Sequence, residues 1–156
     1  MKAIAYAITL FLLAGGGLPE AGDRPTNANH GNQATKVRFV PLAVYIDPQG
    51  RPLAAYQFEM KAIAGHVKIV GVEGGEHPAF KKPPYYDPAA LAQDRIIIAA
   101  FSTNQELPRA KTRVAFVHLQ VSGDVDPRYE LTLTVAAEGN SQQIKATIGF
   151  QEGALQ

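Results

Sequence analysis

Cysteine is absent from all 156 residues of the sequence. A chain without cysteine has no disulfide framework, no thiolate metal site and no cysteine nucleophile. It also lacks the cysteine to which bacterial lipoproteins attach their lipid anchor. We therefore expect a fold stabilised by side-chain packing alone, and a secreted form without such an anchor.

The sequence also has little excess charge of either sign. There are 15 Lys and Arg against 14 Asp and Glu, which gives a net charge of +1. Nucleic-acid binding needs a basic stripe that neutralises phosphates, so nucleic acid is not an expected partner. The hydrophobic content of 46% and charged content of 19% exclude a disordered chain and predict a single packed domain.

A long hydrophobic run is the third missing feature. Lys2 precedes an apolar segment, residues 3–14, that ends at three consecutive glycines. This is the length of a signal-peptide core, whereas a membrane span needs about 20 apolar residues. We predict a signal peptide over residues 1–21, with cleavage near Gly16 or Ala21; a transmembrane or core helix is the alternative. Export implies a secreted protein, extracellular or periplasmic, with no membrane association after cleavage.

The segment after this leader, residues 22–35, is polar and without apolar periodicity, which predicts a flexible tether. From residue 36 to residue 152 the pattern becomes that of β-strands. Residues 37–72 indicate a β-meander that begins with a strand bulged or placed at an edge by Pro41. The tetrapeptide at residues 47–50, Asp-Pro-Gln-Gly, predicts a type I turn.

The clearest strand of this meander alternates between apolar and polar residues. Its apolar positions predict a buried face and its polar positions a solvent face. The apolar positions are Tyr56, Phe58 and Met60, and the polar ones are Gln57, Glu59 and Lys61.

Further strands are predicted at residues 95–101, 112–121, 129–137 and 144–150. The first is apolar at consecutive positions, which indicates a central strand buried on both faces. The last two predict a hairpin. About seven strands without a convincing helix predict an all-β, two-sheet sandwich.

Five of these segments together resemble the strand series of cohesin-like domains: residues 44–46, 53–60, 67–74, 95–101 and 114–121. The resemblance lies in the spacing of apolar residues and the placement of glycines. Such domains belong with the family-2 and family-3 carbohydrate-binding modules among the jelly-roll β-sandwiches of exported bacterial proteins. The resemblance implies a protein-interaction module with a dockerin-like or other protein partner, or else a module that binds polysaccharide.

Residues that suggest catalysis are hard to find. The four histidines, His30, His66, His77 and His118, lack the spacing of a zinc site, and no serine lies in a nucleophile elbow. Asp124 and Asp126 alternate in a turn, but calcium takes six to eight oxygens, and the alternative is a turn held by Asx hydrogen bonds. We predict a protein that is not an enzyme, with no catalytic residues, no metal and no cofactor.

A long irregular loop, residues 76–93, is the candidate partner-binding segment. It contains Phe80, Tyr85 and Tyr86 among several prolines. Tyrosine gives rigid amphipathic area to an interface, so these rings are predicted to stack on a sugar or to anchor a protein. The alternative, which we favour for Tyr85 and Tyr86, is that one or both of these rings cap the end of the core and hold the long loop in place. The absence of tryptophan favours a protein over a polysaccharide as the partner.

Overall fold

The computed structural model describes residues 35–153. The predicted signal peptide, nearly all of the tether, and His30 lie outside the described residues. The described chain contains eight strands and two short 3-10 helices. The strands are β1 (Val37–Asp47), β2 (Ala55–Ala64), β3 (His66–Gly74), β4 (Tyr85–Tyr86), β5 (Arg95–Phe101), β6 (Thr112–Ser122), β7 (Arg128–Ala137) and β8 (Thr147–Glu152). The 3-10 helices are η1 (Pro78–Phe80) and η2 (Pro88–Ala90).

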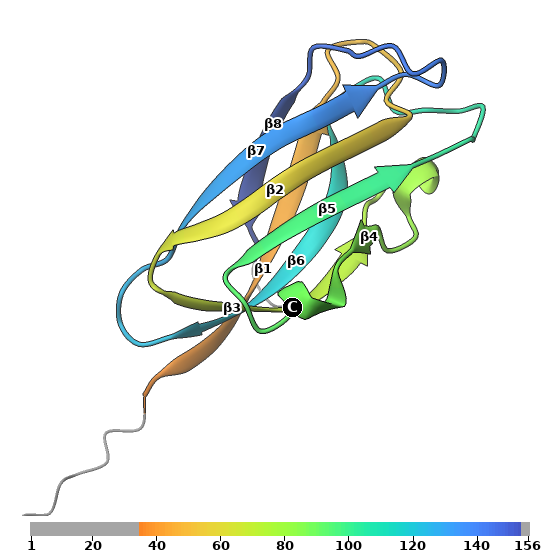
Figure 1. The fold of residues 1–156 in the computed structure, drawn as a ribbon. Helices are drawn as coiled ribbons and strands as arrows, with labels where there is room; N and C mark the ends of the chain where they lie inside the picture. Colours follow the sequence, from red (N-terminus) through yellow and green to blue (C-terminus); the bar gives the residue numbers. More distant parts are fainter. Residues whose placement is uncertain (1–34, 154–156) are drawn as a thin grey trace, which may run out of the picture. The chain divides into compact units, whose positions relative to one another are not determined.

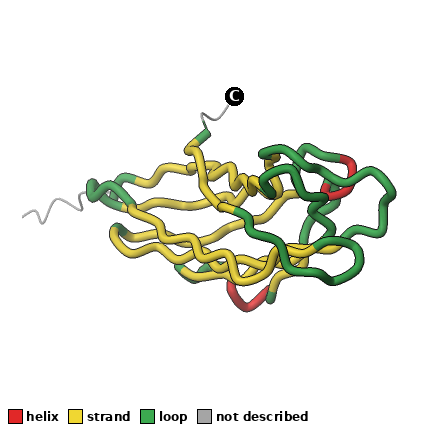
Figure 2. The backbone as a smooth tube through the Cα atoms, turned by 90° about the horizontal axis from the view of Figure 1, so that it is seen from above, coloured by secondary structure: helices red, strands yellow, loops and turns green. Residues whose placement is uncertain are grey.

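The strands form two antiparallel four-stranded sheets packed as a sandwich, so the predicted all-β two-sheet fold is confirmed (Figures 1 and 2). One sheet, which we call sheet A, has the order β3, β6, β1, β8; sheet B has the order β4, β5, β2, β7. Among the described strands, only β4 and β5 are both consecutive in the chain and neighbours in a sheet. In residues 35–153 no helix has the length and apolar character needed to cross a membrane.

The predicted β-meander and the predicted hairpin are both wrong. β1 and β3 lie in sheet A while β2 lies in sheet B, and β7 and β8 also lie in different sheets. The link between β2 and β3 is Gly65, whose φ of +80° turns the chain from one layer into the other. An alternating strand needs both a facing sheet that covers its apolar side and neighbouring strands that pair with its backbone. The sequence pattern does not show which of these two contacts the next strand along the chain supplies.

β1 lies inside sheet A rather than at its edge, and its bulge falls between Val44 and Tyr45 instead of at Pro41. Pro41 is tolerated because β8 ends next to it. The Pro41 carbonyl oxygen accepts a hydrogen bond from the Gly153 N–H at 2.8 Å, just past the end of β8. Since the N and C=O of a strand residue point to the same side, the missing N–H faces β8 rather than β6. Pro41 lies just beyond the paired part of β8, so the bond that is lost is one at the end of that strand.

The turn after β1 is also of a different type from the one predicted. Gln49 and Gly50 both have positive φ, and the Arg51 N–H donates to the Pro48 carbonyl oxygen at 3.1 Å. Two left-handed central residues are the mark of a type I′ turn over residues 48–51. The Asp47 carboxylate accepts from the Gln49 N–H at 2.9 Å and so helps to hold this backbone.

The core lies between the sheets and contains the face predicted for β2. Tyr56, Phe58 and Met60 are all buried, while Lys61 is exposed. From the facing sheet, β6 contributes Val114, Val117, Leu119 and Val121. The alternation in β2 therefore predicted its buried face correctly.

β5 differs from the prediction in a way that matters for function. It is internal to sheet B, and Ile96 and Ile98 are buried, but Ile97 is 42% exposed and Phe101 is 65% exposed. The strand is thus buried on one face only. In a two-layer sandwich each sheet has one outer face, so the apolar residues on the second face of β5 lie at the surface.

Candidate binding surface

The loop between β3 and β4 is folded against the core by η1. The His77 side chain caps η1 by accepting from the Ala79 N–H at 3.2 Å, and the Gly75 N–H donates to the Phe80 carbonyl oxygen at 2.8 Å. The Phe80 ring is 3% exposed and meets the Tyr56 ring edge to face, with 5.1 Å between centroids. Phe80 therefore caps the core and does not lie on an exposed surface.

The start of this loop is packed too closely for side chains. A Cβ on Gly74 would lie 2.1 Å from the Lys81 carbonyl oxygen, and one on Gly75 would lie 2.3 Å from the Arg113 carbonyl oxygen. Next to them, the Glu76 carboxylate accepts from the Arg113 N–H at 2.9 Å. The loop is held in place on β6 by these contacts.

The two adjacent tyrosines of β4 have different environments because successive strand residues point to opposite faces. Tyr86 is partly buried and packs against the core, whereas Tyr85 is 68% exposed on the outer face of sheet B. Of the three predicted binding residues, Tyr85 is thus the one with a largely exposed ring. The structure separates it from Phe80 and Tyr86 rather than bringing the three together.

Tyr85 instead lies beside a residue from a distant part of the sequence. Its ring is stacked with the Phe101 ring, at 6.2 Å between centroids and 7° between planes. Ile97 and Ala99 follow on the same outer side of β5. We call the surface formed by Tyr85, Ile97, Ala99 and Phe101 the aromatic face.

Phe101 and Ile97 were missed as binding residues, although the sequence contains a signal for them. The run of β5 is apolar on both faces, and in a sandwich only one of these faces can be covered by the other sheet. Exposed apolar residues that gather on one face mark interaction sites more often than scattered ones do.

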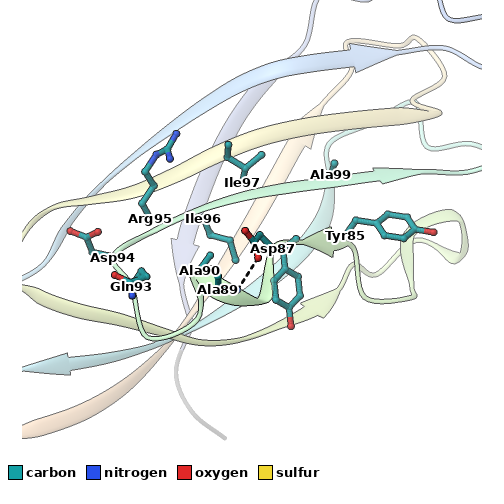
Figure 3. Close-up of a pocket in the computed structure, with 11 residues that line it drawn as sticks. Tyr85, Asp87, Ala89, Ala90, Gln93, Asp94, Arg95, Ile96, Ile97 and Ala99 are labelled. Carbon is teal, nitrogen blue, oxygen red and sulfur yellow. Dashed lines mark hydrogen bonds between the residues drawn. The ribbon is translucent and has the colours of Figure 1, made fainter.

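An open hollow of about 650 Å³ adjoins the aromatic face (Figure 3). It lies between β5 and residues 87–94, and we call it the β5 hollow. In Figure 3, Asp94 and Arg95 lie at one end of it and Tyr85 at the other. A second hollow of about 330 Å³ lies on the other side of Tyr85 and Phe101, next to η1.

The charged groups of the β5 hollow are predominantly acidic. The Arg95 guanidinium donates two hydrogen bonds to the Glu59 carboxylate, at 2.8 and 2.7 Å. These bonds lower the pKa of Glu59 and raise that of Arg95, so both stay charged and neutralise each other. The carboxylates of Asp87 and Asp94 remain; that of Asp87 accepts from the Ala89 N–H at 2.9 Å, as the cap of η2.

Metal-ligating side chains do not gather in residues 35–153, where no group of three or more His, Asp or Glu could hold an ion. Asp126 pairs with Arg38 at 3.3 Å. Two of the histidines have structural partners: His77 caps η1, and the His118 ring lies 3.0 Å from the Glu73 carboxylate.

These features define an all-β, two-sheet sandwich with an exposed aromatic face on one sheet. No protein-family model matches the chain, and neither a curated protein nor a solved structure matches it. The cohesin-like resemblance therefore stays a prediction.

Proposed function

We propose that the protein is an exported, non-catalytic interaction module that binds a protein partner through its aromatic face. The cohesin-like strand spacing and the leader at residues 1–21 support the class and the export. The surface of sheet B supports the choice of a protein partner and the position of its binding site.

The observation that carries this proposal is the pair of exposed rings, Tyr85 and Phe101, on a rigid sheet. Both rings are about two-thirds exposed, and β5 and β4 fix their backbones. Large rings that are already ordered lose little conformational entropy on binding, so they are effective interface anchors. Hollows on both sides of the pair provide concave surface for groups of the partner.

Polysaccharide is the second candidate ligand, and one observation favours it. The planes of Tyr85 and Phe101 differ by only 7°, and parallel exposed rings can stack on successive sugar rings. The hollows and their carboxylates suit a protein segment better than a flat glycan chain, so we place the protein partner first.

The test is capture with the full-length chain and a double variant, Tyr85→Ala with Phe101→Ala. Each of the two proteins is incubated with exported proteins from the source cells and, in parallel, with a panel of insoluble polysaccharides. We expect one protein to be captured by the wild type and to be lost with the double variant. The reduction in affinity should exceed about 30-fold, which is the loss expected from the Tyr85 ring alone.

The matched control is Phe39→Ala. Phe39 is 54% exposed on the outer face of the other sheet, so its removal deletes an exposed ring without altering the aromatic face. Capture should be unchanged with this variant. Retention on a glycan that disappears with the double variant, with no protein captured, would replace the protein partner by polysaccharide.

A further inference from the structure

The backbone of β5 has two sides, and the hydrogen bonds at its ends show which residues face which side. The Ala62 N–H donates to the Asp94 carbonyl oxygen, and the Ser102 N–H donates to the Ala54 carbonyl oxygen, both at 2.8 Å. These bonds point from even-numbered residues toward β2. Since the polar groups of a strand alternate between its two sides, the odd-numbered residues of β5 direct their N–H and C=O toward β4.

β4 is too short to cover this side of β5. Its two residues pair with Ala99 and Ile98 only. Asp87 then leaves the ladder to cap η2, and the chain returns to β5 through residues 88–94. The backbone groups of Arg95 and Ile97 consequently face the β5 hollow, which both residues line.

A comparable edge nearby is covered by the chain itself. On β3, the Ile69 N–H donates to the Gln93 carbonyl oxygen and the Ile69 carbonyl oxygen accepts from the Ala92 N–H. Natural sheets usually protect their edges in this way, because an open edge is a template for another strand. Residues 92 and 93 thus close the edge of β3, whereas no backbone hydrogen bond joins residues 88–94 to Arg95 or Ile97.

The composition of the hollow indicates which strand it fits. Ile97 and Ala90 offer apolar contacts, and the carboxylates of Asp87 and Asp94 supply negative charge, since Glu59 neutralises Arg95. An added strand presents alternate side chains to opposite faces. Apolar and basic residues in alternation would therefore match the lining.

We propose that the β5 hollow binds an extended, basic segment of a protein partner, which adds to β5 as a strand by pairing with the backbone of Arg95 and Ile97. The inference rests on the proposed function, because the partner held by the aromatic face would supply this segment. Backbone pairing would give affinity, and the two carboxylates would select lysine or arginine over acidic residues.

The experiment uses the full-length protein labelled with nitrogen-15 and the peptide acetyl-Thr-Val-Lys-Val-Lys-Val-Thr-amide, added to about 1 mM, the weak end of useful affinity. Amide hydrogen exchange is followed residue by residue. In the free protein, the amides of Arg95 and Ile97 should exchange quickly while those of Ile96 and Ile98, directed to β2, are protected. The peptide should slow exchange at Arg95 and Ile97 and leave Ile96 and Ile98 unchanged.

Two modified peptides test the two parts of the proposal. Methylation of alternate backbone nitrogens removes the pairing groups but keeps the side chains, and should abolish the protection. Replacement of both lysines by glutamate should weaken binding.

The variant Asp94→Asn should lower affinity for the lysine peptide by about two- to fivefold, the range for an exposed ion pair. Asp124→Asn, an exposed carboxylate in the turn after β6, is the matched control and should have no effect.

No protection at Arg95 and Ile97 with the lysine peptide would overturn the proposal, as would equal protection by the methylated peptide. Slow exchange of both amides in the free protein, with concentration-dependent self-association, would show that a second copy fills the edge and would also overturn it. Failure of the proposed function looks different: the double variant would then capture its partner normally, whatever the peptide does at β5.

Discussion

The Tyr56 hydroxyl donates a hydrogen bond to the backbone carbonyl oxygen of Val114, 3.0 Å away, and so joins the two sheets through the core. Tyr56 belongs to β2 in sheet B, and Val114 belongs to β6 in sheet A. A buried hydroxyl needs such a partner, because leaving it unpaired costs about 1 to 3 kcal/mol. The bond ties residues 58 positions apart in the sequence.

Removal of this bond should lower stability without altering the fold. Tyr56→Phe keeps the ring, which packs against Phe80, and deletes only the hydroxyl. We expect a loss of about 1 to 2 kcal/mol in the free energy of unfolding, measured by urea denaturation. An unchanged midpoint would mean that the carbonyl oxygen of Val114 is satisfied without the tyrosine.

The same residue should make the protein sensitive to alkali. Burial raises the pKa of the Tyr56 hydroxyl above its usual value, and burial also raises that of Tyr129 to about 12. The unfolded chain loses these protons at a lower pH than the folded chain does. The stability that the two hydroxyls contribute is therefore complete below about pH 10, the ordinary tyrosine pKa, and the free energy of unfolding falls as the pH rises above that value. Denaturation across this range should show a steeper loss for the wild type than for Tyr56→Phe.

The face assignment of β2 can be tested with two neighbouring residues. Phe58→Ala should lower the free energy of unfolding by about 3 to 5 kcal/mol, since the ring is fully buried. Glu59→Ala should change it by less than about 0.5 kcal/mol, because its pair with Arg95 is at the surface. Similar losses at both positions would contradict the observed phase of the strand.

The contrast between Tyr85 and Tyr86 gives a second neighbouring pair. Tyr86→Ala should destabilise the fold by more than about 1 kcal/mol, because the ring packs against the core. Tyr85→Ala should alter thermal stability little and act on binding instead, with a loss of about 2 kcal/mol in affinity for the partner. If Tyr85→Ala instead destabilised the fold and Tyr86→Ala weakened binding, the assignment of the two rings would be wrong.

The close packing of the two glycines before η1 can be tested by adding a single methyl group. Gly75→Ala places a Cβ against the Arg113 backbone and should cost about 1 to 3 kcal/mol, since neither strand nor loop can shift freely. Gly149→Ala is the control, because a Cβ there has nothing within 4 Å. Thermal denaturation of the two variants should separate them clearly.

Local patterns in the sequence determined the fold class and most strand positions. The alternation in residues 55–64 defined a buried face, because burial of one side of a strand imposes a period of two. The pattern did not determine which strands pair. β1, β2 and β3 follow one another along the chain yet alternate between sheets, since pairing depends on contacts between residues distant in sequence.

For the candidate site, the sequence by itself determined that an aromatic, proline-rich loop follows β3. Only the tertiary structure decided what each ring does. It buries Phe80 against Tyr56, packs Tyr86 on the core, and brings Tyr85 beside Phe101. The physical reason is that a side chain's exposure depends on which layer covers its strand. In this sandwich the outer face of β5 is left uncovered, and its apolar residues form the surface on which the proposed function rests.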